Sequence, residues 1–141
     1  RNMQFVFFFD VMEIPEMESD ADISLPSTYF AGIINQLEIF GDTIEFSCNE
    51  DKIILNSLSV ESGKMTVNID IEDITSYAIN EGETMNISFS LNRLHNICMY
   101  NKLSKEVEIM LTNNFPMKIT YPLNMDEAKM VFYLAPKISE D

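Results

Sequence analysis

The stretch "PSTYFAGIINQLEIFG", residues 26–41, decides the fold of this chain. Its apolar residues recur every three or four positions, which is the spacing of one buried face of an α-helix. These residues are Phe30, Ile33, Ile34, Leu37 and Phe40. Ser27 is suited to cap the start of the helix, and Gly41 is suited to end it. The stretch therefore predicts one amphipathic helix.

A second amphipathic segment, "NISFSLNRLHNICMYNKL", occupies residues 86–103. Its expected buried stripe consists of Leu91, Leu94, Ile97 and Cys98. Phe30 opens the first helix and Phe89 opens the second, 59 positions later. Each helix is followed by two alternating runs typical of a strand hairpin, at 43–59 and 106–122. A duplicated unit of this kind predicts an α+β fold, with two helices side by side on one face of curved antiparallel sheets.

The composition is that of a globular chain with an acidic surface. The 141 residues include 23 Asp and Glu against 9 Lys and Arg, which gives a formal net charge of -14. We expect one hydrophobic core in a chain of this length. A simple basic nucleic-acid module is a poor match, because phosphate binding relies on Lys and Arg. The longest apolar run, residues 5–9, is far shorter than the roughly 20 residues of a membrane span, so no membrane partner is expected.

Nothing in the sequence favours catalysis. His95 is the only histidine, so a metal site would need carboxylates, and a solvated helix histidine is the simpler interpretation. Phosphate-binding glycine loops and zinc-binding helix motifs do not occur. Cys48 and Cys98 lack metal-site spacing and fit free thiols in a reducing compartment. We expect no catalytic residue, metal or cofactor. An enzyme of unknown type is therefore the third hypothesis, after the two non-catalytic functions described below.

Two segments outside the helices carry further information. The end of the chain, "KMVFYLAPKISED" at 129–141, runs from an apolar strand into a proline-stiffened tail. Such a tail is either a frayed terminus or a surface that another molecule covers. The segment "EIPEMESDAD" at 13–22 has many carboxylates and little periodicity, which predicts an extended linker.

These segments together resemble the C-terminal domain of proliferating cell nuclear antigen (PCNA), the eukaryotic DNA sliding clamp. The resemblance rests on "FYLAPKI" before acid, on "IPE", and on the pattern "PS..FA.I...L...GD.I.FSC", and it covers residues 10–141. It implies the DNA-clamp fold, with two such domains per subunit and three subunits in a ring around double-stranded DNA. Residues 1–24 would then be interdomain connector and residues 25–141 the C-terminal clamp domain. The implied location is the nucleus, or a viral replication compartment if the protein is viral.

The resemblance also implies a groove where DNA polymerases and other replication and repair proteins insert a short peptide with a hydrophobic plug, and it implies a clamp loader as a further partner. The groove residues would be Met12, Ile14 and Pro15 in the connector, Phe115 and Pro116 in a wall, and Tyr133, Leu134, Ala135, Pro136 and Lys137 in the tail. The alternative is that Tyr133 and Leu134 are the last buried residues of a strand, and that the prolines only end strands.

The inner surface of a clamp presents helices to DNA phosphates without reading bases. The face of the first predicted helix that points away from its apolar stripe has no basic residue and consists of Gly32, Asn35, Gln36 and Ile39. The residues expected to face DNA are Asn35, Asn92, Arg93, His95 and Lys102. Each missing phosphate contact flattens the dependence of log affinity on log salt by roughly 0.9. Either the missing half carries most of the positive charge, or the chain is a divergent clamp, viral or from a fast-evolving eukaryote. The neutral inner helices also favour a second hypothesis, a clamp-derived interaction module that keeps the groove but does not encircle DNA.

Two further segments have open interpretations. "ESGKMTVNI" at 61–69 resembles the edge strand by which one clamp subunit pairs with the next, or it is a plain edge strand protected by Lys64. The expected interface residues are Lys64, Met65, Thr66, Val67 and Asn68. "FVFFFD" at 5–10 is interpreted as the end of a strand from the missing domain, with a docking strip as the alternative.

Overall fold

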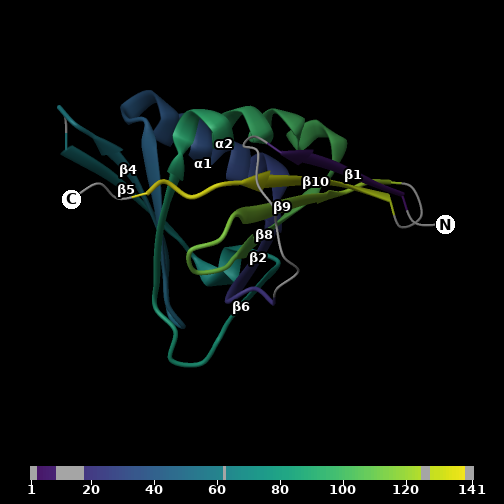
Figure 1. Cartoon of the computed structure of the whole chain (residues 1–141), viewed down its shortest axis with the longest axis horizontal. Coiled ribbons are helices and arrows are strands. Elements are labelled where there is room, and N and C mark those ends of the chain that lie inside the picture. The colour runs from purple at the N-terminus through teal and green to yellow at the C-terminus, as the bar shows by residue number, and fades with distance from the viewer. Residues whose placement is uncertain (1–2, 9–17, 62, 125–127, 139–141) are drawn as a thin grey trace.

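A computed structural model describes residues 3–8, 18–61, 63–124 and 128–138, with main chain only for 3–8. Within these residues the chain forms two α-helices and two β-sheets (Figure 1). The first sheet has six strands, in the spatial order β1 (Met3–Phe8), β10 (Ala128–Leu134), β9 (Met117–Pro122), β8 (Glu106–Leu111), β2 (Ala21–Pro26) and β6 (Ser76–Ile79). The second has four, in the order β5 (Gly63–Ile69), β4 (Ile53–Ser59), β3 (Thr43–Cys48) and β7 (Met85–Ser90).

The sheet order shows how the two halves of the chain combine. Strands β3, β4 and β5 follow the first helix and share a sheet with β7, which precedes the second helix and pairs with β3. Strands β8, β9 and β10 follow the second helix and share a sheet with β2, which precedes the first helix and pairs with β8. Each half therefore lends its first strand to the sheet of the other half. The predicted duplication is confirmed, and its unit is a strand, a helix and three further strands.

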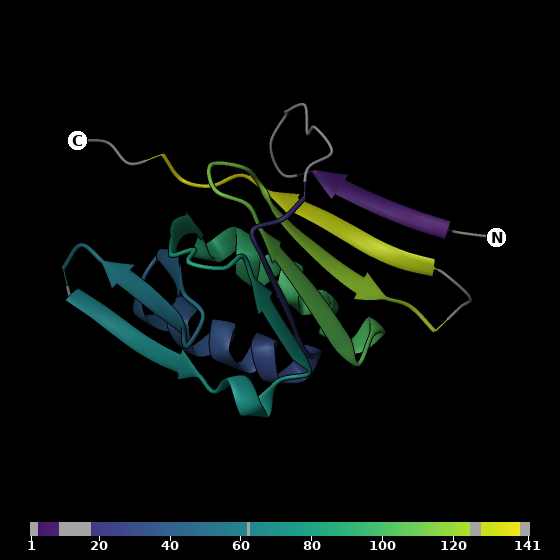
Figure 2. The same ribbon diagram turned by 90° about the horizontal axis from the view of Figure 1, so that it is seen from below.

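The helices α1 (Ser27–Phe40) and α2 (Leu91–Cys98) contact each other along one side of the sheets (Figures 1 and 2). This arrangement confirms the predicted α+β clamp fold. Two short 3-10 helices, η1 (Ile71–Asp73) and η2 (Met99–Leu103), complete the described elements. The predicted cap at Ser27 is wrong, because this side chain is buried and its hydroxyl donates to the carbonyls of Asn101, at 2.9 Å, and Ser104.

The second predicted helix begins later than the sequence pattern suggests. Phe89 is a buried residue of β7, and Ser90 caps a helix that starts at Leu91. Phe30 and Leu94 are each the fourth residue of their helix and are each buried. Leu94 is therefore the residue of the second helix that corresponds to Phe30. The prediction chose Phe89 because the alternating pattern of a buried strand runs directly into the helical pattern.

The ordered domain also begins earlier than residue 25. Ala21, Ile23 and Leu25 are buried in β2, which pairs with β8 on one side and β6 on the other. The acids Asp20 and Asp22 around Ala21 hid this alternation. Part of the predicted 1–24 connector is therefore a strand of the domain. Residues 5–8 of the aromatic segment lie in β1, whose main chain pairs in parallel with β10, the one parallel pair among the described strands.

One hydrophobic cluster joins both helices and both sheets. Cys48 and Cys98 belong to it as buried free thiols, and burial raises the pKa of each thiol from 9.0 to about 12. The Tyr121 hydroxyl donates to the Ile97 carbonyl at 3.1 Å and so ties the six-stranded sheet to α2. In the described part of the chain no group of three or more His, Cys, Asp or Glu is arranged to hold a metal ion. No helix described there is long and apolar enough to cross a membrane.

Candidate functional site

The carboxyl-terminal tail begins beside the predicted wall. Leu134, the last residue of β10, lies opposite Met117, the first residue of β9. Phe115 and Pro116 directly precede β9, and both are half-buried. The antiparallel pairing of β9 with β10 therefore places the start of the tail next to these two residues.

The residues of the predicted tail differ in how much surface they offer. Leu134 is 0% exposed and belongs to the core, so for its side chain the interpretation as a strand end is correct. Tyr133 is half-buried within β10. Ala135 and Pro136 are half-buried beyond the strand, and Lys137 is exposed. The surface available to another molecule comes from Tyr133 and from the tail after Leu134.

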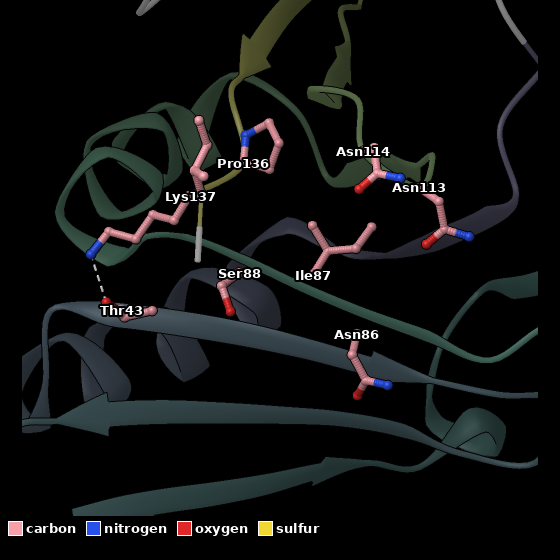
Figure 3. A pocket seen from close by; sticks show the side chains of 9 residues that line it. Thr43, Asn86, Ile87, Ser88, Asn113, Asn114, Pro136 and Lys137 are labelled. Carbon is pink, nitrogen blue, oxygen red and sulfur yellow. Dashed lines mark hydrogen bonds between the residues drawn. The ribbon is translucent and has the colours of Figure 1, made fainter. Parts of the chain in front are cut away.

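The tail is attached to the second sheet. The Lys137 amide donates to the Ser88 carbonyl at 2.7 Å, and the Lys137 Nζ donates to Thr43 Oγ1 at 2.6 Å (Figure 3). Strand β7, which contains Ser88, is an edge of the four-stranded sheet. The tail therefore leaves the six-stranded sheet and binds the edge of the other sheet, which rules out a freely frayed end as far as Lys137.

A cavity of about 620 Å³ opens beside the attached tail (Figure 3). The tail, the turn between β8 and β9, and strands β3 and β7 supply its lining, namely Thr43, Asn86, Ile87, Ser88, Asn113, Asn114, Pro136, Lys137 and Ile138. Most of these side chains are uncharged donors or acceptors, with Ile87, Pro136 and Ile138 as apolar surface. A segment of another chain could place both polar groups and an apolar side chain here.

Sequence reasoning missed Thr43, Asn86, Ser88 and Asn113 as lining residues. A signal was present in β7, where Asn86 and Ser88 alternate with the buried Met85 and Ile87. That alternation predicts a polar face but does not say which segment covers it.

The residues expected to face DNA lie on the paired helices and their extension. Asn35 on α1 and Asn92 on α2 are exposed, Arg93 and His95 are half-buried, and Lys102 on η2 is exposed. The face of α1 without basic residues is confirmed as outward, because all of its members are exposed, namely Gly32, Asn35, Gln36 and Ile39.

The predicted interface strand is an edge strand. Strand β5 lies at the end of the four-stranded sheet and pairs with β4 alone in that sheet. Lys64, Thr66 and Asn68 are exposed, while Met65 and Val67 are half-buried and pack on the core. This alternation is the expected one, and it fits both a plain edge strand and one that pairs with a second subunit.

The three predicted connector residues, Met12, Ile14 and Pro15, lie outside the described residues. Of the other predicted groove residues, Tyr133 and Leu134 pair with the start of β9, which directly follows Phe115 and Pro116. Among the described residues of the predicted set, only Pro136 and Lys137 line the cavity.

Comparisons with known proteins agree with this architecture. The family model described as "Proliferating cell nuclear antigen, C-terminal domain" matches residues 13–138. The proliferating cell nuclear antigen of Chaetomium thermophilum is 32% identical over 132 residues, which cover 91% of this chain and 51% of that protein. The chain thus spans about half the length of this curated relative. Because the family model covers most of the chain, the protein belongs to the family of PCNA C-terminal domains.

Proposed function

We propose that this chain is the carboxyl-terminal half of a DNA sliding clamp that works without catalysis in the nucleus. Membership of the PCNA C-terminal domain family supports this function, and the chain covers half of its relative's length. In this proposal the segment before β2, within the predicted connector of residues 1–24, leads from a preceding clamp domain. The whole subunit would assemble with two others into a ring around double-stranded DNA, opened by a clamp loader.

The surface formed by the tail and the β8–β9 turn is our proposed docking site for partner peptides. Its occupant would be a short segment with a hydrophobic plug, carried by DNA polymerases and by other replication and repair proteins. Two hydrogen bonds from Lys137 already order the tail, so a docking peptide has less conformational entropy to remove. Phe115 and Pro116 offer apolar surface next to Tyr133, and Met12, Ile14 and Pro15 would complete the groove.

Replacing Pro136 with Glu tests the docking site. A carboxylate at this half-buried position would have to be desolvated against an apolar plug, so we expect a labelled plug peptide from a replicative polymerase to bind about tenfold more weakly or worse. Fluorescence anisotropy measures the affinity. Pro122→Glu is the matched control, because Pro122 is exposed at the end of β9 and does not line the cavity. Equal weakening by both variants, or no binding by the unaltered chain, would contradict the proposal.

The contact with DNA is proposed to be loose and sequence-independent. Lys102 is the exposed basic residue on the predicted DNA-facing surface, and Arg93 and His95 are half-buried. Asn35 and Asn92 can donate hydrogen bonds to phosphates but release no counterions. Processivity would then depend on closing the ring, with the edge of β5 pairing to the next subunit.

The uncharged outward face of α1 favours a second candidate function, an interaction module derived from a clamp. Such a module would keep the docking site but would not encircle DNA. The full-length protein loaded on circular DNA distinguishes the two. A clamp stays on the closed circle at high salt and leaves when the circle is cut, whereas a module is not retained on either form.

A further inference from the structure

Asp20 connects three segments at one end of the docking surface. Its Oδ2 accepts a hydrogen bond from the Asn113 amide at 2.9 Å, and its Oδ1 accepts one from Asn80 Nδ2 at 3.1 Å. Its own amide donates to the Leu111 carbonyl at 2.8 Å, and its carbonyl accepts from the Asn80 amide at 2.9 Å. Asp20 is therefore bound by both main chain and side chain to the ends of β6 and β8.

The Asn113 side chain is held as well. Its Nδ2 donates to the Glu83 carboxylate, and the Glu83 amide donates to the Asn80 carbonyl at 3.0 Å. Two carboxylates from different loops thus fix Asn113. Asp20 binds the main-chain amide of Asn113, and Glu83 binds its side chain. Hydrogen bonds to charged acceptors are stronger than those between neutral groups.

Asn113 starts the turn that forms one wall of the cavity. The turn is closed by a hydrogen bond from the Phe115 amide to the Thr112 carbonyl at 3.1 Å. Asn114 adopts a φ of 64°, a left-handed conformation that asparagine tolerates but that surrounding contacts must maintain. Asn113 and Asn114 line the cavity, and Phe115 follows them in the sequence. The contact with Asp20 therefore holds one end of this wall in position.

We propose that Asp20 is a positioning residue for the peptide-docking site. Its carboxylate joins the segment that enters β2 to the turn carrying the wall, and it holds that turn in the shape a partner peptide would bind. The inference rests on the proposed function, because it takes the cavity beside the tail as part of the docking site. Asp20 lies within the predicted connector of residues 1–24, directly before β2, so one carboxylate links this segment to the turn that forms the wall.

Hydrogen exchange tests the contact without any partner. In Asp20→Ala we expect the Asn113 amide, followed by NMR in the 141-residue chain, to exchange about tenfold faster or more, because a hydrogen bond to a charged acceptor is lost. Asp73→Ala is the matched control, since Asp73 is an exposed acid on η1 that does not line the cavity. It should leave the Asn113 rate unchanged.

Asp20→Asn provides a rescue. Its amide oxygen can still accept from the Asn113 amide, and its NH₂ group can donate to Asn80 once the Asn80 side-chain amide is turned over. We therefore expect exchange close to that of the unaltered chain. If Asp20→Ala does not fold, Asp20→Ser replaces it, because its shorter side chain cannot reach both loops, and the same acceleration is expected.

Peptide affinity tests the consequence. We expect Asp20→Ala to bind the labelled plug peptide about five- to tenfold more weakly, with Asp20→Asn and Asp73→Ala near the unaltered chain. Unchanged exchange at Asn113 in Asp20→Ala would overturn the inference, and so would faster exchange with unchanged peptide affinity. If the unaltered chain binds no plug peptide, the proposed function fails, and the exchange rate of Asn113 alone then decides whether Asp20 holds the turn.

Discussion

Replacing Leu134 with Ala is expected to lower the free energy of unfolding by about 2–5 kcal/mol, the range for truncating a fully buried leucine. Leu134 is 0% exposed, ends β10, and lies opposite the buried Met117. The substitution removes apolar surface from the core and leaves a cavity at the base of the tail. Chemical denaturation followed by circular dichroism measures the loss.

The control for this substitution lies in the same strand. Lys129 in β10 is half-buried and charged, and Lys129→Ala should change the unfolding free energy by less than about 0.5 kcal/mol. Comparable small effects from both variants would show that Leu134 does not anchor the tail in the core. A large loss of unfolding free energy at Leu134 alone would show that the motif up to Leu134 stabilises the core. The residues after Leu134 would then form the surface part of the motif.

Gly41→Ala is expected to destabilise the domain by about 3 kcal/mol, at the upper end of the usual cost of overpacking. An alanine Cβ at this position would lie 2.4 Å from the Leu58 carbonyl oxygen and 2.8 Å from Ser57 Oγ. Ser57 Oγ donates a buried hydrogen bond to the Leu37 carbonyl at 2.7 Å, so moving Ser57 aside would weaken that bond. The β4 main chain at Leu58 would have to move away from Gly41, which would also move β4 away from α1. Thermal and chemical unfolding measure this effect.

Gly32→Ala is the matched control in α1. A Cβ at Gly32 would meet no atom within 4 Å, and the residue is exposed in the helix. Alanine has the higher helix propensity, so the same substitution here should stabilise the domain by roughly 0.5–1 kcal/mol. Opposite signs at the two glycines are the expected result. A neutral Gly41→Ala would mean that the helix and β4 do not approach as closely as described.

Much of the fold was predictable because its periodic patterns are strong. The stripe of α1 was assigned correctly at Phe30, Ile33, Ile34 and Leu37, all of which are buried. The pairing of β3 with β4 followed from two alternating runs around a polar turn. In these elements the spacing of apolar residues along the chain matches the residues that are buried, so the sequence alone predicts them.

The errors arose where one pattern runs into another. Residues 85–90 alternate as a strand and are followed at once by a helix, so the shared apolar residue Phe89 was assigned to the helix. The alternation of Ala21, Ile23 and Leu25 was obscured by Asp20 and Asp22, the acids on either side of Ala21. In both cases the pairing with a distant strand, β3 or β8, decides the local structure.

The site could be predicted only in part, for a related reason. The tail and the wall residues came from family resemblance, and the pairing of β9 with β10 explains why they meet. Thr43 and Lys137, which bond across the end of the cavity, are 94 positions apart. A contact at that separation leaves no periodic trace in the sequence. The role inferred for Asp20 depends likewise on contacts with Asn80 and Asn113 that only the folded chain brings together.

The most direct test of the docking site is to map a plug peptide onto the isotope-labelled chain by NMR. We expect the largest amide shift changes at Ser88, Asn113 and Lys137, around the cavity beside the tail. Changes centred instead on the outward face of α1 or on β5, with these three amides unmoved, would contradict it.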